Sequence, residues 1–162
     1  GMRAGMTDCE DNYVAIKVMC DIFGGGVYSK LFNNVREKMS LCYAIGSGYY
    51  GSKGIVTVSA GIDFEKEEVT RQEVLRQLKA CQDGDITQEE LTAARQAILS
   101  SLRATHDSPG AIEGYYASAA ISGIGMDTEQ FMEAVEAVTL PDVIEAAKTL
   151  QLQSVYFLKG DK

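Results

Sequence analysis

The pattern of apolar and polar positions divides the chain into helical stretches around one alternating segment. Between residues 28 and 39, apolar side chains recur at intervals of three and four, which predicts a surface helix with one buried face. The apolar positions of this face are Tyr28, Leu31, Phe32, Val35 and Met39. From residue 43 to residue 50 the period shortens to two, and this alternation predicts a β-strand.

A second alternating segment follows this predicted strand after a short turn. Residues 51–54, Gly-Ser-Lys-Gly, predict a hairpin loop, because glycine accepts the tight backbone conformations of such turns. In residues 55–62, apolar side chains alternate with the short ones of Thr57, Ser59 and Gly61. One face of the hairpin is therefore predicted to pack against the core. The other suits the border of a peptide-sized chamber, and an ordinary solvated sheet face fits the pattern equally well.

Helical spacing fills most of the remaining chain. One helix is predicted before the glycine run Gly24–Gly26, and five are predicted after the hairpin, between about residue 65 and residue 150. Residues 3–5 predict the end of a strand, and the apolar run from Ser154 to Leu158 predicts a returning strand. Three of the later helices carry clear N-terminal signals: Thr87 with Glu90, Ser108 with Pro109, and Asp127.

The order of these elements limits the fold class. Two helices, a hairpin, five helices and a final strand do not alternate as a doubly wound parallel sheet requires. The order instead predicts an α+β fold, in which a mainly antiparallel sheet has helices packed on one face. The 162 residues suit a single domain, residues 1–162, that buries a continuous core.

Composition and charge exclude several classes of function. The net charge is -8, the pI is near 4.7 and there is no basic run, so we expect no nucleic-acid partner. An acidic surface instead attracts basic peptides. No run approaches the roughly 20 apolar residues that span a bilayer, so we expect no membrane partner. The four cysteines are widely spaced without a C-x-x-C pair, which indicates reduced thiols and favours the cytoplasm.

The glycine run Gly24–Gly26 permits two interpretations. Free amides at the start of a helix can cradle a phosphate, and three glycines before a helix resemble such a cradle. However, the run lacks the Lys-Ser/Thr of a Walker loop, and the segment before it is helical, whereas a dinucleotide site follows a strand. A close turn between two helices is therefore the favoured interpretation.

Two residues beside the change from helix to strand carry candidate chemistry. Arg36 lies at the edge of the predicted buried face, where its stem can follow apolar surface while its guanidinium offers five donors to a carbonyl or carboxylate. Tyr43 opens the predicted strand seven residues later, and its hydroxyl can grip the same group. Without further information, the simpler interpretation is that Arg36 pairs with Glu37 or another acid on a solvated face and that Tyr43 is a half-buried core ring.

The run GGG-x-x-S-K-L-F-x-x-V-R-E-K-x-x-L-C-Y, residues 24–43, changes this balance. It resembles the start of the C-terminal, non-catalytic repeat of the pitrilysin family of inverted zincins, and the resemblance runs along nearly the whole chain. Arg36 and Tyr43 match a pair that, in family members, reaches the zinc site of the other repeat and holds the substrate backbone or the developing oxyanion. The departures are Met39, Ser40 and Cys42, which stand where members often have small residues and a glycine.

The resemblance also implies where the metal lies. The active repeat of the family carries His-x-x-Glu-His, whereas this chain has one histidine, His106. We therefore expect no cofactor in this chain, zinc in a partner repeat or subunit, and no activity from this segment alone. His106 stands between two helical stretches, and we expect it at a helix end or in a loop.

Two functions follow from the resemblance. In the first, the chain closes the substrate chamber of a zinc peptidase, and its partners are a peptide substrate and the catalytic zinc-bearing repeat or subunit. In the second, it is a catalytically inactive structural or chaperone-like homologue that binds peptides or partners without cleavage. A standalone anion-binding module is a weaker third idea.

The resemblance further implies a fragment of a longer protein. Family repeats have strands before the position where this chain starts, and Gly1-Met2 resembles the scar of a cleaved tag. We therefore expect truncated N-terminal strands and an exposed sheet edge, which favours a homodimer.

Overall fold

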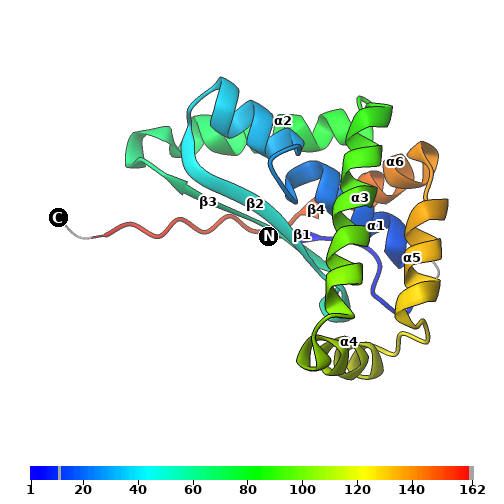
Figure 1. The fold of residues 1–162 in the computed structure, drawn as a ribbon. Coiled ribbons are helices and arrows are strands. Elements are labelled where there is room, and N and C mark those ends of the chain that lie inside the picture. The colour runs from blue at the N-terminus through cyan, green and yellow to red at the C-terminus, as the bar shows by residue number, and fades with distance from the viewer. Residues whose placement is uncertain (11, 161–162) are drawn as a thin grey trace.

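The computed structural model describes residues 1–10 and 12–160, and its sheet has four antiparallel strands in the order β2-β3-β1-β4 (Figure 1). The strands are β1 (Met2–Arg3), β2 (Cys42–Tyr50), β3 (Ile55–Ile62) and β4 (Gln151–Leu152). The helices are α1 (Tyr13–Gly24), α2 (Glu67–Gln82), α3 (Gln88–Thr105), α4 (Pro109–Ser122), α5 (Thr128–Ala137) and α6 (Leu140–Thr149). The helices pack on one face of the sheet, which confirms the predicted α+β fold.

Helix α1 lies at the centre of the core. It contacts β2 and also α3, α5 and α6. Its sequence is apolar almost all round, as expected for a helix enclosed on every side. Ile16, Met19 and Phe23 are fully buried, and burial of each such side chain contributes about 1.5–3 kcal/mol to folding.

Helix starts follow the predicted caps. Thr87 and Glu90 form the capping box of α3, with the Glu90 amide donating to Thr87 Oγ1 at 3.1 Å. Ser108 caps α4 ahead of Pro109, and Asp127 forms a capping box with Gln130 at the start of α5. Among the described residues, no helix combines the length and the apolar composition that crossing a membrane requires.

The helix predicted over residues 28–39 has an unexpected geometry. Its main part is a π-helical segment, η1 (Phe32–Lys38), in which the Met39 amide donates to the Asn34 carbonyl five residues back. This wider turn breaks the 3.6-residue spacing on which the prediction relied. As a result, Val35 is fully buried as expected, but Met39 at the end of the pattern is 41% exposed.

The predicted hairpin is present, with one irregularity. Gly51–Lys53 forms a single 3-10 turn, and Gly54 takes the left-handed conformation with φ of 59° that glycine accepts without strain. The register runs from Cys42 opposite Ile62 to Tyr50 opposite Ile55. A shift between Cys42 and Ala44 leaves Tyr43 as an extra residue, a β-bulge that bends the strand there.

The strand predicted from Ser154 to Leu158 is wrong. The last strand is the two-residue β4, and residues 153–160 belong to no helix or strand. An apolar run becomes a strand only where a second chain segment supplies the ladder hydrogen bonds, and the pairing of β4 with β1 is limited to Gln151 and Leu152.

Candidate functional site

Arg36 lies in the last turn of η1, beside the sheet. Its guanidinium carbon is 4.6 Å from the centre of the Phe32 ring, so the side chain follows apolar surface as the sequence predicts. Its Nε is 3.8 Å from Glu37 Oε1, a long ion pair, and 38% of the side chain is exposed. A guanidinium held by a ring on one face and by one distant carboxylate keeps donors available to a further acceptor.

Tyr43 occupies the bulge at the start of β2 and is 88% exposed. The ring is therefore a surface group and not the half-buried core ring that the simpler interpretation expects. It borders a hollow of about 470 Å³ at this end of the hairpin. The other residues that line this hollow are Ser40, Leu41, Cys42, Gly61, Ile62, Asp63 and Lys66.

Arg36 and Tyr43 lie on neighbouring elements, because η1 packs against β2. Burial raises the pKa of the Cys42 thiol, and the positive charges of Arg36 and Lys66 oppose that rise. Tyr43 is the next residue in the chain. The two candidate residues therefore come from adjoining elements, and Arg36 does not line the hollow that Tyr43 borders.

Lys66 is a member of this neighbourhood that sequence reasoning missed. Its Nζ donates to the Ser40 carbonyl at 3.2 Å and pairs with Asp63 Oδ2 at 3.1 Å. A signal exists in the sequence, because Lys66 stands alone among glutamates just before α2, where the helix dipole favours acids. Its position there is explained by the contact with the η1–β2 turn.

The glycine run begins at the last residue of α1 and packs against β2, the strand that carries Tyr43. A Cβ added to Gly24 would lie 2.7 Å from the Ser47 amide nitrogen and 2.9 Å from Leu31 Cδ1, so only glycine lets the helix end approach β2 this closely. The Gly25 amide donates to the Asp21 carbonyl at 2.8 Å. This packing gives the run a structural role in placing η1 against β2.

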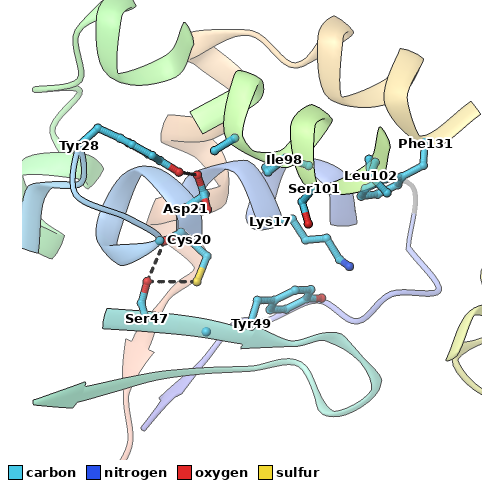
Figure 2. Close-up of a pocket in the computed structure, with 13 residues that line it drawn as sticks. Lys17, Cys20, Asp21, Tyr28, Ser47, Tyr49, Ile98, Ser101, Leu102 and Phe131 are labelled. Atoms are coloured by element: carbon cyan, nitrogen blue, oxygen red, sulfur yellow. Dashed lines mark hydrogen bonds between the residues drawn. The ribbon is translucent and has the colours of Figure 1, made fainter. Parts of the chain in front are cut away.

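A second hollow, of about 470 Å³, lies between α1, β2 and α3 (Figure 2). Cys20 Sγ is 3.3 Å from Ser47 Oγ, and this hydroxyl donates to the Cys20 carbonyl at 2.7 Å. The Tyr28 hydroxyl donates to Asp21, as the dashed line in Figure 2 marks. Lys17 reaches into the same space, with its ammonium 5.3 Å from the centre of the Phe131 ring.

The electrostatics of this second hollow do not provide a nucleophile. Burial raises the pKa of the Cys20 thiol to about 11, against a smaller lowering by the Ser47 hydrogen bond, so the thiol stays protonated at neutral pH. Burial also raises the pKa of Asp21, which the Tyr28 hydrogen bond partly offsets. Burial lowers the pKa of Lys17, the cation of this space. The hollow can accept a polar group but does not assemble a nucleophile with an adjacent base.

His106 lies at the C-terminal cap of α3, as predicted, and its Nε2 is 2.8 Å from Thr128 Oγ1. Within residues 1–10 and 12–160, no group of three or more histidine, cysteine, aspartate or glutamate side chains is placed to hold a metal ion. The residues present therefore do not fit a zinc site of the kind that the pitrilysin resemblance associates with catalysis.

Fold and site together define a class: an α+β domain with no metal-ligand cluster among its described residues. The family model for the peptidase M16 inactive domain matches residues 1–98, which include η1 and the hairpin. The chain belongs to this family, and the resemblance seen in the sequence is confirmed.

Curated relatives and solved structures agree with this assignment. The chain is 32% identical over 160 residues to a Bacillus subtilis protein named "Probable inactive metalloprotease YmfF", covering 99% of this chain and 38% of that protein. It is 30% identical over 137 residues to an uncharacterized zinc protease of Rickettsia bellii, covering 83% of this chain and 33% of that protein. The chain therefore spans little more than a third of the length of these relatives.

Two solved structures share the fold. A conserved protein from Enterococcus faecalis superposes with a TM-score of 0.86 at 29% identity, over 94% of this chain and 36% of that one. The peptidase M16 inactive domain from Pseudomonas fluorescens gives a TM-score of 0.79 at 24% identity, over 90% of this chain and 35% of that one. The second likeness supports the fold alone.

Proposed function

We propose that this chain is the non-catalytic repeat of a zinc peptidase, which closes the substrate chamber and holds the peptide with Arg36 and Tyr43. The observation that supports the proposal is that Arg36 and Tyr43 lie on two elements that pack together, η1 and β2, within the segment that the family model matches. In this proposal the zinc and its ligands belong to another repeat or subunit, and relatives named as zinc proteases support that arrangement.

The available donors support this role. The Arg36 guanidinium has five N–H donors, and Glu37 at 3.8 Å engages it weakly. The Tyr43 hydroxyl is carried on a ring that is 88% exposed, so a bound peptide can reach it. Both groups are suited to a peptide carbonyl oxygen, and both bind more strongly as that oxygen gains negative charge in the transition state.

The adjoining sheet face can lie against an extended peptide. Ala44, Gly46 and Gly48 of β2 lie opposite Gly61, Ser59 and Thr57 of β3, so the side chains of this face are short. A Cβ added to Gly61 would meet no atom within 4 Å, so the surface is open there. A flat wall of this kind accepts a backbone without selecting for large side chains.

The proposal is tested in the assembled peptidase that contains this repeat. Arg36→Ala removes a positioned donor worth about 3 kcal/mol to the transition state, so kcat/KM for a reporter peptide is expected to fall roughly a hundredfold or more. Tyr43→Phe removes one hydroxyl and is expected to give a similar fall. Arg103→Ala, at an exposed arginine in the last turn of α3, is the matched control and is expected to leave kcat/KM unchanged. Unchanged turnover in Arg36→Ala would remove the assigned role.

One comparison favours the second function, an inactive homologue that binds without cleaving. The Bacillus subtilis relative is itself named as an inactive metalloprotease. Under this alternative, the assembled protein retains a basic reporter peptide, detected by fluorescence anisotropy, while mass spectrometry finds the peptide intact. Cleavage products that require zinc would decide for the peptidase.

A further inference from the structure

Lys17 and Asp21 lie one turn apart on α1, and both line the hollow between α1, β2 and α3. A lysine and an aspartate four residues apart on a helix are neighbours that can form an ion pair. In the part of the chain that the structure describes, neither side chain forms one. Figure 2 shows the two side chains turned in different directions from α1. The hollow therefore contains a cation and an acid that do not neutralise each other.

The ammonium of Lys17 lies beside two aromatic rings. The centre of the Tyr13 ring is 5.8 Å away and that of the Phe131 ring is 5.3 Å away, distances at which the face of a ring attracts a cation. Burial lowers the pKa of Lys17, although the charge of Asp8 acts in the opposite direction. A carboxylate beside the ammonium would restore the interactions with water that burial removes. This end of the hollow is thus suited to a carboxylate.

Asp21 lies in the last turn of α1, where no residue is basic. The carbonyls at a helix C-terminus carry partial negative charge, so an acid there is unfavourable and a cation beside it is favourable. The Tyr28 hydroxyl donates to Oδ2 of Asp21. A Cβ added to Gly25 would collide with Oδ1, so the glycine leaves this second oxygen accessible. This end of the hollow is thus suited to an ammonium group.

Apolar side chains line the space between these two ends. Ile98 and Leu102 come from α3, and Phe131 comes from α5 (Figure 2). Ser47 of β2 and Ser101 of α3 add hydroxyl groups to the lining. The volume of about 470 Å³ lies within the range of roughly 300–1,000 Å³ that is usual for small-molecule sites. The hollow thus combines two charged ends with an apolar wall.

The spacing of the two charged residues sets the length of a ligand. Residues four apart lie about 6 Å apart along a helix, because the rise is about 1.5 Å per residue. An extended dipeptide spans about 7 Å, since each residue adds at most about 3.6 Å. In a single α-amino acid the ammonium and the carboxylate are bonded to the same carbon, which is too close to reach both ends. The spacing therefore fits a dipeptide better than a free amino acid.

We propose that this hollow binds a small zwitterion of dipeptide size, whose carboxylate lies beside Lys17 and whose ammonium lies beside Asp21. The second side chain of the ligand packs against Leu102 and Phe131. Each charged residue thereby gains an opposite charge that no described residue supplies. The lining of this hollow shares no residue with that of the hollow beside Tyr43, so the proposal is independent of the peptidase role proposed above.

The test uses three ligands that differ only at their ends. Ala-Leu carries both charges, N-acetyl-Ala-Leu lacks the ammonium, and Ala-Leu-amide lacks the carboxylate. Each is titrated into the isotope-labelled 162-residue chain, and Kd is obtained from the amide chemical shifts. Ala-Leu is expected to shift the amides of residues 17–21, 47–49 and 98–102. Each blocked ligand is expected to bind at least about tenfold more weakly, because it loses one charge-assisted hydrogen bond.

Two variants assign the ends of the ligand. Lys17→Met keeps an apolar stem and removes the ammonium, so it is expected to bind Ala-Leu and Ala-Leu-amide with similar affinity. Asp21→Asn removes the negative charge, so it is expected to bind Ala-Leu and N-acetyl-Ala-Leu with similar affinity. Lys53→Met, at an exposed lysine in the hairpin turn, is the matched control and is expected to keep both preferences.

Three results would overturn the proposal. If Ala-Leu gives no saturable shifts, the hollow does not bind a dipeptide, and if all three ligands bind equally, its charged ends do not select one. If the shifts centre on residues 40–43, the ligand occupies the hollow beside Tyr43 instead. The comparison of ligands uses the unsubstituted chain, so it does not depend on the folding of a variant. Failure here leaves the peptidase role standing, because Arg36→Ala tests that role separately.

Discussion

The two halves of the sheet are completed to different degrees. Strands β2 and β3 pair from Cys42 opposite Ile62 to Tyr50 opposite Ile55, and α1 and η1 pack against β2. Strands β1 and β4 pair through two residues each, and the apolar segment after β4 remains exposed. The difference shows that a hairpin forms from neighbouring sequence, whereas a strand far along the chain depends on a partner segment that local sequence does not supply.

The largest difference in stability is expected between a side chain of α1, which packs on β2, and a side chain of the segment after β4. Phe23→Ala deletes a fully buried ring from α1, and we expect the free energy of unfolding to fall by about 3–5 kcal/mol. Leu158→Ala removes a side chain that is 77% exposed, and we expect a change within about 0.5 kcal/mol. Urea denaturation followed by circular dichroism measures both.

A smaller difference in stability is expected between alanine substitutions at two glycines that both lie in helices. Gly24→Ala places a methyl group 2.7 Å from the Ser47 amide nitrogen, and since backbone cannot easily yield, we expect a loss of about 1–3 kcal/mol. Gly114→Ala, within α4, meets nothing within 4 Å and is expected to gain up to about 1 kcal/mol from helix propensity. Thermal unfolding of the two variants checks the signs. A neutral Gly24→Ala would mean that α1 and β2 can separate without cost.

Local signals in the sequence predicted the helices well. The errors lie in the sheet, where strand pairing decides the structure. Caps such as Thr87 and Asp127 act on amides three residues away, so a short window contains them. The bulge that exposes Tyr43 depends on which residue of β3 lies opposite, and the end of β4 at Leu152 depends on its pairing with β1. Both are properties of pairing between two segments, which periodicity within one segment does not contain.

The candidate site also has a part that local sequence predicts and a part that it does not. Arg36 and Tyr43 were identified because their spacing matches a family motif, and the structure adds Lys66, which comes from the turn before α2. Its contact with the Ser40 carbonyl joins residues 26 positions apart, so no local pattern contains it. A sequence motif therefore predicts single candidate residues, but it does not predict which residues from other parts of the chain lie beside them.

The smallest expected effect concerns the turn that places Tyr43 after η1. Ser40 has a φ of 49°, the left-handed region that favours glycine, and it is one of the positions where this chain departs from the family pattern. Ser40→Gly is therefore expected to raise the free energy of unfolding by about 1 kcal/mol. Ser52→Gly, in the 3-10 turn of the hairpin, is the matched control and is expected to lower it by up to about 1 kcal/mol, since glycine adds only unfolded-state freedom there. If chemical denaturation shows a loss for both variants, the left-handed turn carries no strain, and another contact accounts for Ser40.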